Sequence, residues 1–140
     1  MRKYAIDSNV IIEIVNGNEN SRARLNDILD RKDEIVIPPI VFYEVMCGFY
    51  HNPSKKKEAV FFGLRKRQLI GQFYDFSGDL LWDKAARIFA ELKRKGKGHA
   101  IGHGDILLAS YCMVNNLILI TKNTKHFKYI DGLALEDWMG

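Results

Sequence analysis

The sequence contains few of the residues that define several large classes of protein. Only 2 of its 140 residues are cysteine, Cys47 and Cys112, and no CxxC spacing occurs. A secreted disulfide scaffold carries more cysteines, and two of them cannot form a zinc site by themselves. Both lie among apolar residues, so we expect each to behave as a small buried hydrophobe.

Long apolar runs and a strong charge imbalance are also missing. No run approaches the roughly 18 residues of a membrane span, and the chain reaches Asp7 before a signal-peptide core could form. We therefore expect a soluble, cytoplasmic protein with no membrane partner. The 21 Lys and Arg exceed the 17 Asp and Glu by a net charge of +4. That surplus permits a nucleic-acid partner without establishing one.

What the chain does contain is enough apolar material for one core. Hydrophobic residues make up 47% of it, which excludes a disordered or fibrous chain. Its length predicts a single domain over residues 1–140. Apolar runs typical of strands alternate with helical patterns, which predicts an α/β fold with a short, mainly parallel sheet covered on both faces. The expected strands are residues 4–6, 34–37, 72–75, 117–121 and 133–135, and the expected helices begin near residues 8, 21, 40, 55, 77 and 105.

Three carboxylates stand in apolar segments. Asp7 follows the first expected strand, Glu44 lies inside the apolar helix of residues 40–50, and Asp105 opens another apolar helix. Sites in parallel sheets form outside the carboxyl ends of the strands, where Asp7 and Thr121 stand. Glu44 has no Lys or Arg three or four positions away, so if buried it needs a partner from elsewhere.

Each of these acids has an ordinary explanation when it is taken alone. Asp7 and Asp105 can cap helices, and Glu44 can occupy an exposed helix edge. Together, however, three acids without neighbouring cations would repel one another, and a hard divalent cation relieves that repulsion. Mg²⁺ prefers oxygen ligands, keeps several waters and often needs only one or two carboxylates, whereas zinc favours Cys and His. Such a site among basic segments predicts metal-assisted cleavage of phosphodiester bonds.

The same residues carry a resemblance to a known family. Its marks are residues 6–10 (IDSNV), 39–44 (PIVFYE), 100–109 (AIGHGDILLA), 119–127 (LITKNTKHF) and 133–138 (LALEDW). In this order they resemble the PIN-domain ribonucleases, and within them the VapC toxins of bacterial toxin–antitoxin pairs. The resemblance covers essentially the whole chain. It implies a PIN-like three-layer α/β/α sandwich, RNA cleavage that depends on Mg²⁺ or Mn²⁺, and a cognate antitoxin that occludes the site.

The resemblance also implies roles for individual residues. Asp7, Glu44 and Asp105 match the acidic triad that holds the metal and carries catalysis in this family. Asn9 and Thr121 match polar positions that orient those carboxylates. Many PIN nucleases carry a fourth acid where this chain has Asn123, whose amide can hydrogen-bond water or a carboxylate but adds no charge. The family analogy favours a transfer RNA as the substrate.

Basic residues form two groups, Lys55–Lys57 with Arg65–Arg67, and Lys93–Lys97. They are either solvated helix faces or a rim that contacts RNA phosphates around the acidic site. We expect His126, in a turn after the last core strand, to be an ordinary loop residue. Aromatic residues gather on the two helices between residues 40 and 68, which predicts an apolar surface for an antitoxin and a homodimer.

Two other interpretations remain open. Haloacid-dehalogenase-like phosphotransfer enzymes begin with a strand that ends in Asp-x-Asp, but here Asn9 replaces the second acid and Glu44 has no role in that scheme. Covalent phosphate on Asp7 would support this interpretation. The other is a non-catalytic PIN-like module that binds RNA or protein. Degenerate members of that kind lose acids from the site, whereas this chain keeps three.

Overall fold

The computed structural model describes residues 1–68 and 78–138. Its strands form a parallel sheet in the order β2-β1-β3-β4, so the predicted α/β fold is confirmed. The strands are β1 (Lys3–Ile6), β2 (Glu34–Val36), β3 (Ile118–Thr121) and β4 (Leu135–Asp137). The strand predicted at residues 133–135 is thus displaced to Leu135–Asp137, and the one predicted at 72–75 lies outside the described residues.

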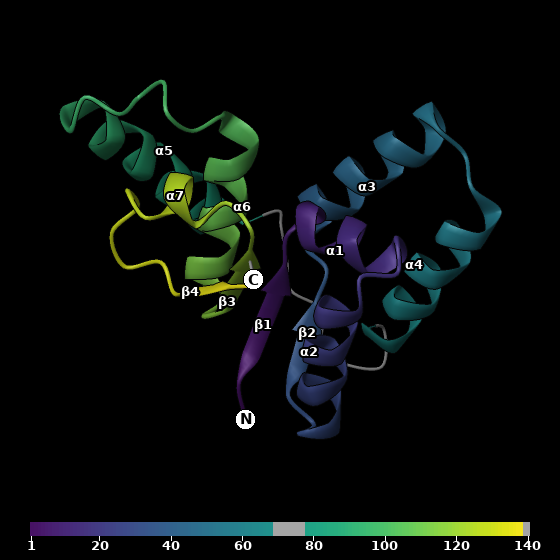
Figure 1. The fold of residues 1–140 in the computed structure, drawn as a ribbon. Coiled ribbons are helices and arrows are strands. Elements are labelled where there is room, and N and C mark those ends of the chain that lie inside the picture. The colour runs from purple at the N-terminus through teal and green to yellow at the C-terminus, as the bar shows by residue number, and fades with distance from the viewer. Residues whose placement is uncertain (69–77, 139–140) are drawn as a thin grey trace.

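The helices lie in two groups on either side of this sheet (Figure 1). In Figure 1 α1 to α4 occupy one side and α5 to α7 the other, which is the predicted three-layer arrangement. The sheet is apolar on both faces because both are covered, and Tyr4, Ala5 and Ile6 of β1 are fully buried. The helices are α1 (Ser8–Val15), α2 (Glu19–Asp30), α3 (Pro39–His51), α4 (Lys55–Gln68), α5 (Asp79–Arg94), α6 (His103–Val114) and α7 (Thr124–Phe127).

Local hydrogen bonds cap two of these helices, and the start of a third differs from the prediction. Asp7 caps α1, because its carboxylate accepts from the backbone N–H of Ser8 at 2.7 Å. Ser54 begins α4 as predicted, accepting from the backbone N–H of Lys57 at 3.3 Å. α6 begins at His103, two residues earlier than predicted. Asp105 therefore lies inside the first turn of α6, so its carboxylate is not the cap.

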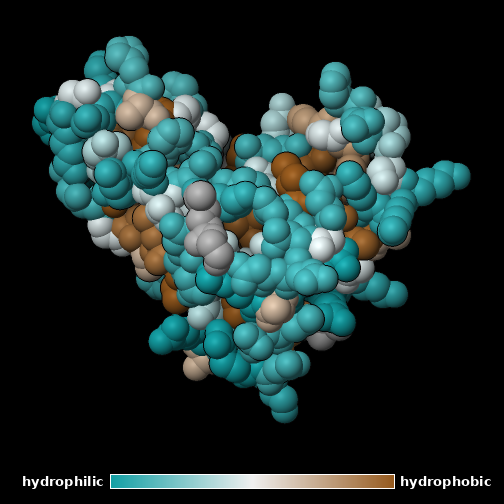
Figure 2. All heavy atoms as spheres, viewed as in Figure 1, coloured by the Kyte–Doolittle hydropathy of each residue, from teal (hydrophilic) through white to brown (hydrophobic). Residues whose placement is uncertain are grey.

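Aromatic side chains join α3 to α4. Phe61 is fully buried, with its ring centroid 5.8 Å from that of Phe49 and 6.1 Å from that of Phe42. Tyr43 and Tyr50 stay 63% and 81% exposed, so α3 keeps an apolar surface as predicted. Figure 2 shows the molecule hollowed between the two groups of helices, with hydrophobic residues exposed on the side of α3 and α4.

The two cysteines differ from each other. Cys112 is buried as expected, whereas Cys47 is exposed on α3, so the prediction for Cys47 was wrong. Cys47 lies one turn beyond Tyr43 and Glu44, on the side of α3 that faces away from its buried residues. None of the helices in the part of the chain described here is long and apolar enough to cross a membrane.

Candidate acidic site

Asp7 and Thr121 meet where β1 and β3 end. The register pairs Ile6 with Ile120, so the residues that follow them, Asp7 and Thr121, lie at the same edge of the sheet. The Asp7 backbone N–H donates to the Ile120 carbonyl at 2.9 Å. The Thr121 hydroxyl donates to Oδ2 of Asp7 at 2.8 Å. Parallel strand pairing therefore brings together two residues that lie 114 positions apart in sequence.

The Asp7 carboxylate is buried and held in a fixed direction. Its residue is 4% exposed. Oδ1 accepts from the backbone N–H of Ser8, and the Asn9 amide nitrogen lies 3.5 Å from Oδ2. Burial raises the pKa of Asp7, while the hydrogen bonds from Thr121 and Ser8 act against that rise. The chain itself thus fixes this carboxylate, without help from a ligand.

The turn after β3 holds Asn9 and Thr121 in place. The backbone N–H of Asn123 donates to Oγ1 of Thr121 at 3.0 Å, and that of Lys122 donates to Oδ1 of Asn9 at 3.2 Å. The Lys122 ammonium pairs with Glu13, which lies one turn beyond Asn9 on α1. The Asn123 side chain is exposed and makes no hydrogen bond to a residue within 1–68 or 78–138, so Asn123 acts here through its backbone.

Glu44 and Asp105 face Asp7 from two different helices. Glu44 comes from α3 and Asp105 from the first turn of α6. Partial burial raises the pKa of Glu44 to about 7, with further contributions from the charges of Asp7 and Asp105. Burial, followed by the charge of Asp7, also raises the pKa of Asp105. The structure therefore brings all three predicted acids within electrostatic range of one another.

Glu44 is less enclosed than its sequence context predicts. The residue is exposed on α3, because that helix buries the stripe of Val41, Val45 and Phe49 and turns Glu44 away from it. Of the two placements that its sequence allows, the exposed helix edge is the one found, and the buried carboxylate is not. The expectation that it has no cationic partner on its own helix holds, because none of the ion pairs among the described residues includes Glu44.

His126 is a residue near the site that sequence reasoning missed. It lies on α7, and its charge opposes the rise in the pKa of Asp105, which places it within electrostatic range of that carboxylate. Glu13 and Lys122 were missed for a similar reason, because their contact joins residues 109 positions apart. Nothing in the local sequence around any of these three residues signals the contact.

The donor set fits a hard divalent cation. Its three carboxylates are free of ion pairs within the described segments, and their mutual repulsion is relieved when a cation binds. Over those same segments, no three His, Cys, Asp or Glu side chains lie close enough together to hold a metal ion by themselves. That arrangement suits Mg²⁺, which keeps several waters and uses one or two carboxylates, better than zinc, which needs a closed set of ligands.

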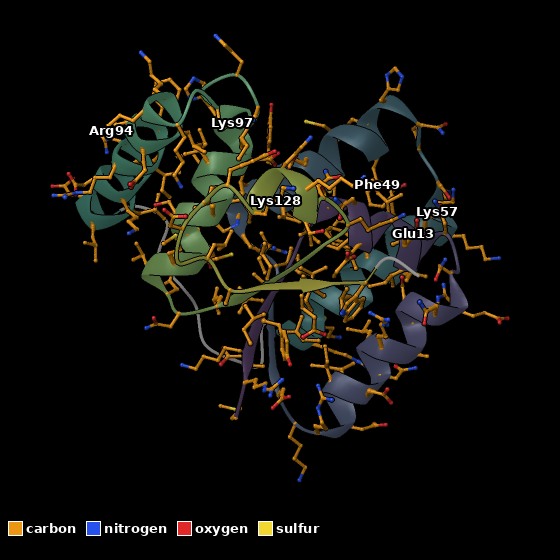
Figure 3. All side chains as sticks on the ribbon, turned by 60° about the vertical axis from the view of Figure 1, so that its left-hand side comes forward. Glu13, Phe49, Lys57, Arg94, Lys97 and Lys128 are labelled. Carbon is orange, nitrogen blue, oxygen red and sulfur yellow. The ribbon has the colours of Figure 1, made fainter. Side chains whose placement is uncertain are left out.

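A small cavity opens beside Glu44. Its volume is about 200 Å³, and it lies between α1, α3 and the start of α4, with Ile12, Phe49 and Lys57 among its lining residues. Figure 3 shows Phe49 and Lys57 in the same part of the molecule as Glu13. The acidic site is thus continuous with an apolar cavity on its α1–α4 side.

Known proteins with similar sequences share this fold. The PIN domain family matches residues 4–133. Ribonuclease VapC2 of Rickettsia felis is 32% identical, over 96% of this chain and 97% of its own. The tRNA(fMet)-specific endonuclease VapC of Shigella flexneri is 29% identical, over 99% of each chain. The crystal structure of VapBC2 from Rickettsia felis, bound to a DNA fragment from its promoter, matches with a TM-score of 0.77 and 30% identity, over 97% of this chain and 98% of the other.

The chain therefore belongs to the PIN-domain family, and within it to the VapC ribonucleases. This membership disfavours the phosphotransfer interpretation, which also gave no role to Glu44. It leaves the choice between an active nuclease and a non-catalytic module to the chemistry of the site.

Proposed function

We propose that the protein is an endoribonuclease toxin that requires Mg²⁺, for which Mn²⁺ can substitute, and that a cognate antitoxin neutralises. The observation that carries the proposal is the set of three carboxylates, from the end of β1, α3 and α6, that act on one another and form no ion pair among the described residues. The activity of the relatives supports RNA as the substrate. The name of the Shigella flexneri relative favours a transfer RNA.

The residues of the site divide into those that bind the cation and those that position them. Asp7 and Asp105 would hold the cation directly, and Glu44 would complete the site directly or through a water. A bound divalent cation would polarise the scissile phosphate and lower the pKa of the attacking water. Thr121 and Ser8 fix the direction of the Asp7 carboxylate, while Asn9 and the backbone of Asn123 hold Thr121. Without a cation the pKa of Glu44 is about 7. A bound cation would lower this pKa, so Glu44 would be ionised near neutral pH and could accept a proton at its carboxylate.

The antitoxin would cover the apolar surface beside the acids. Ile12 and Tyr43 are 50% and 63% exposed, Tyr50 is 81% exposed, and the cavity at Phe49 lies between α1 and α3. Exposed apolar surface of this kind commonly marks an interface. The Rickettsia felis structure, which is a VapBC2 complex, supports a protein partner. We also propose a homodimer, to be tested by sedimentation of the toxin alone and with its antitoxin.

The test of this function is cleavage of bulk transfer RNA by the purified protein. Wild type and Asp27→Asn, a matched change at an exposed acid on α2, are expected to cleave in Mg²⁺ and to stop in excess chelator. Asp7→Asn is expected to be inactive. Cleavage by Asp7→Asn, or undiminished cleavage in chelator, would contradict the proposal. RNA binding by the wild type without cleavage in either metal would instead favour the non-catalytic module.

A further inference from the structure

Two lysines from different segments meet around one aromatic ring. The Lys97 ammonium lies 4.8 Å from the ring centroid of Tyr129, and the Lys128 ammonium lies 5.3 Å from the same centroid. Lys97 follows α5, whereas Lys128 follows α7. The fold therefore assembles a compact pair of positive charges that neither segment forms alone.

Lys97 and Lys128 are not neutralised by a carboxylate of the described residues, unlike the nearby Lys95. Lys95 donates to Asp131 at 2.8 Å and to the Tyr129 carbonyl at 3.1 Å, so its charge is paired and it anchors the backbone of the ring. Neither Lys97 nor Lys128 has a carboxylate partner in the described part of the chain. Two like charges held close together without a counter-charge attract an anion.

The two lysines lie on segments that adjoin residues near the acidic site along the chain. Lys128 follows His126 by two residues, and His126 is within electrostatic range of Asp105. Lys97 stands in the connection that leads from α5 into α6, whose first turn carries Asp105. Figure 3 shows Lys97 and Lys128 in the α5–α7 group, with Lys57 and Phe49 in the α1–α4 group. Lys57 and Lys97, one from each basic group of the sequence, thus lie in different groups of helices.

We propose that Lys97, Lys128 and Tyr129 form a clamp for the phosphodiester backbone of the RNA, on the α5–α7 side of the molecule. This inference rests on the proposed function and extends it to one side of the site. Lysine binds phosphate as a point charge, and contacts to the backbone set position and affinity but carry no sequence information. Lys55 and Lys56, which are exposed at the start of α4, are then outside the clamp.

The experiment compares two double variants that lose equal charge. Lys97→Gln with Lys128→Gln removes the clamp, and Lys55→Gln with Lys56→Gln removes two exposed charges from α4. Binding of bulk transfer RNA is measured in chelator over a range of salt, and cleavage is measured in Mg²⁺. The clamp variant is expected to raise Kd and KM about tenfold with kcat nearly unchanged. It should also flatten the salt dependence by about 1.4 in slope, since each single-strand phosphate contact contributes about 0.7.

The control variant is expected to change each quantity less than about twofold, because scattered surface charges act weakly at physiological salt. Equal weakening by both double variants would show general attraction and overturn the clamp. An unchanged KM and salt slope in the clamp variant would overturn it as well. If the wild type binds RNA but does not cleave it, the proposed nuclease function fails, and the binding measurement in chelator still decides the clamp.

A second pair of variants tests the ring. Tyr129→Phe keeps the aromatic face and is expected to behave as wild type. Tyr129→Leu removes the face that both ammonium groups contact and is expected to raise KM several-fold with kcat retained. Thermal melts show whether Tyr129→Leu is folded. If it is not, the double lysine variants alone test the clamp. Wild-type KM in a folded Tyr129→Leu protein would contradict the role of the ring.

Discussion

The two sides of the acidic site are built in different ways. On the sheet side, Asp7 is 4% exposed and receives hydrogen bonds from Ser8, Thr121 and Asn9. On the α3 side, Glu44 is exposed, accepts no hydrogen bond from a described residue, and has its pKa raised to about 7. The fold fixes the direction of the Asp7 carboxylate. In contrast, burial and the charges of Asp7 and Asp105 disfavour the ionised form of Glu44 until a cation binds.

This difference indicates a division of labour. A carboxylate that is already oriented loses little freedom when it binds a metal, so Asp7 is suited to be the fixed ligand. A carboxylate whose pKa is raised by burial and by neighbouring acids is returned to its ionised form when a cation binds, so Glu44 responds most to the metal. The asymmetry can be broken from either side, and changes at the carboxylates are expected to have larger effects than changes farther away.

Glu44→Gln should have the largest effect. RNA cleavage is expected to fall by about 10²- to 10⁴-fold, since a group that accepts a proton is lost. The melting temperature of the metal-free protein should rise or stay level, because the repulsion with Asp7 and Asp105 is removed. Its increase on adding Mg²⁺ should be smaller than in the wild type. Glu91→Gln, at an exposed acid on α5, is the matched control. An active Glu44→Gln protein with an unchanged response to Mg²⁺ would leave only Asp7 and Asp105 in the site.

Thr121→Val should have the next largest effect. The change keeps the shape of the side chain but removes the hydroxyl that donates to Asp7. Loss of such an orienting bond typically costs about 10- to 100-fold in metal affinity or activity. Cleavage rates over a Mg²⁺ titration should show a higher Mg²⁺ requirement, and Thr124→Val on α7 serves as the control. A normal Mg²⁺ requirement in Thr121→Val would mean that the fold does not orient Asp7 through this hydroxyl.

The Glu13–Lys122 ion pair should matter less, because both side chains are partly exposed, at 29% and 33%. Lys122→Met is expected to lower kcat about fivefold, which corresponds to about 1 kcal/mol for a pair of this kind. The exchange Glu13→Lys with Lys122→Glu restores opposite charges and should recover part of the rate. If the exchange variant is as slow as Lys122→Met, the opposite charges of Glu13 and Lys122 do not contribute to the cleavage rate.

The smallest effect is a dependence of stability on pH. The pKa of Glu44 is raised from 4.5 to about 7 on folding, so the folded state favours the protonated form. Glu44 does not destabilise the folded protein at a pH below its pKa in the unfolded chain. Its destabilising effect is complete at a pH above its pKa in the folded protein. The metal-free protein should therefore melt at a lower temperature as pH rises through this window, and Glu44→Gln should flatten the slope. A wild-type slope in Glu44→Gln would assign the effect to other groups, such as Asp7 and Asp105.

The sequence predicted the position of Asp7 better than it predicted the position of Glu44. Asp7 and Thr121 are adjacent because parallel strands end at one edge, which follows from apolar runs and their order along the chain. The exposure of Glu44 depends on how α3 is turned about its axis, and the nearly all-apolar sequence of α3 does not define a single buried face. The contact of Glu13 with Lys122 depends on the tertiary fold for the same reason.

The location of a bound cation tests the central claim most directly. Crystals soaked in Mn²⁺ would give an anomalous diffraction peak at each metal site. We predict a peak between the carboxylates of Asp7 and Asp105, with Glu44 bound to it directly or through one water, and no such peak in Asp7→Asn. A metal-free site at these residues in crystals of a protein that cleaves RNA in Mn²⁺, or a peak held by other residues, would contradict the account.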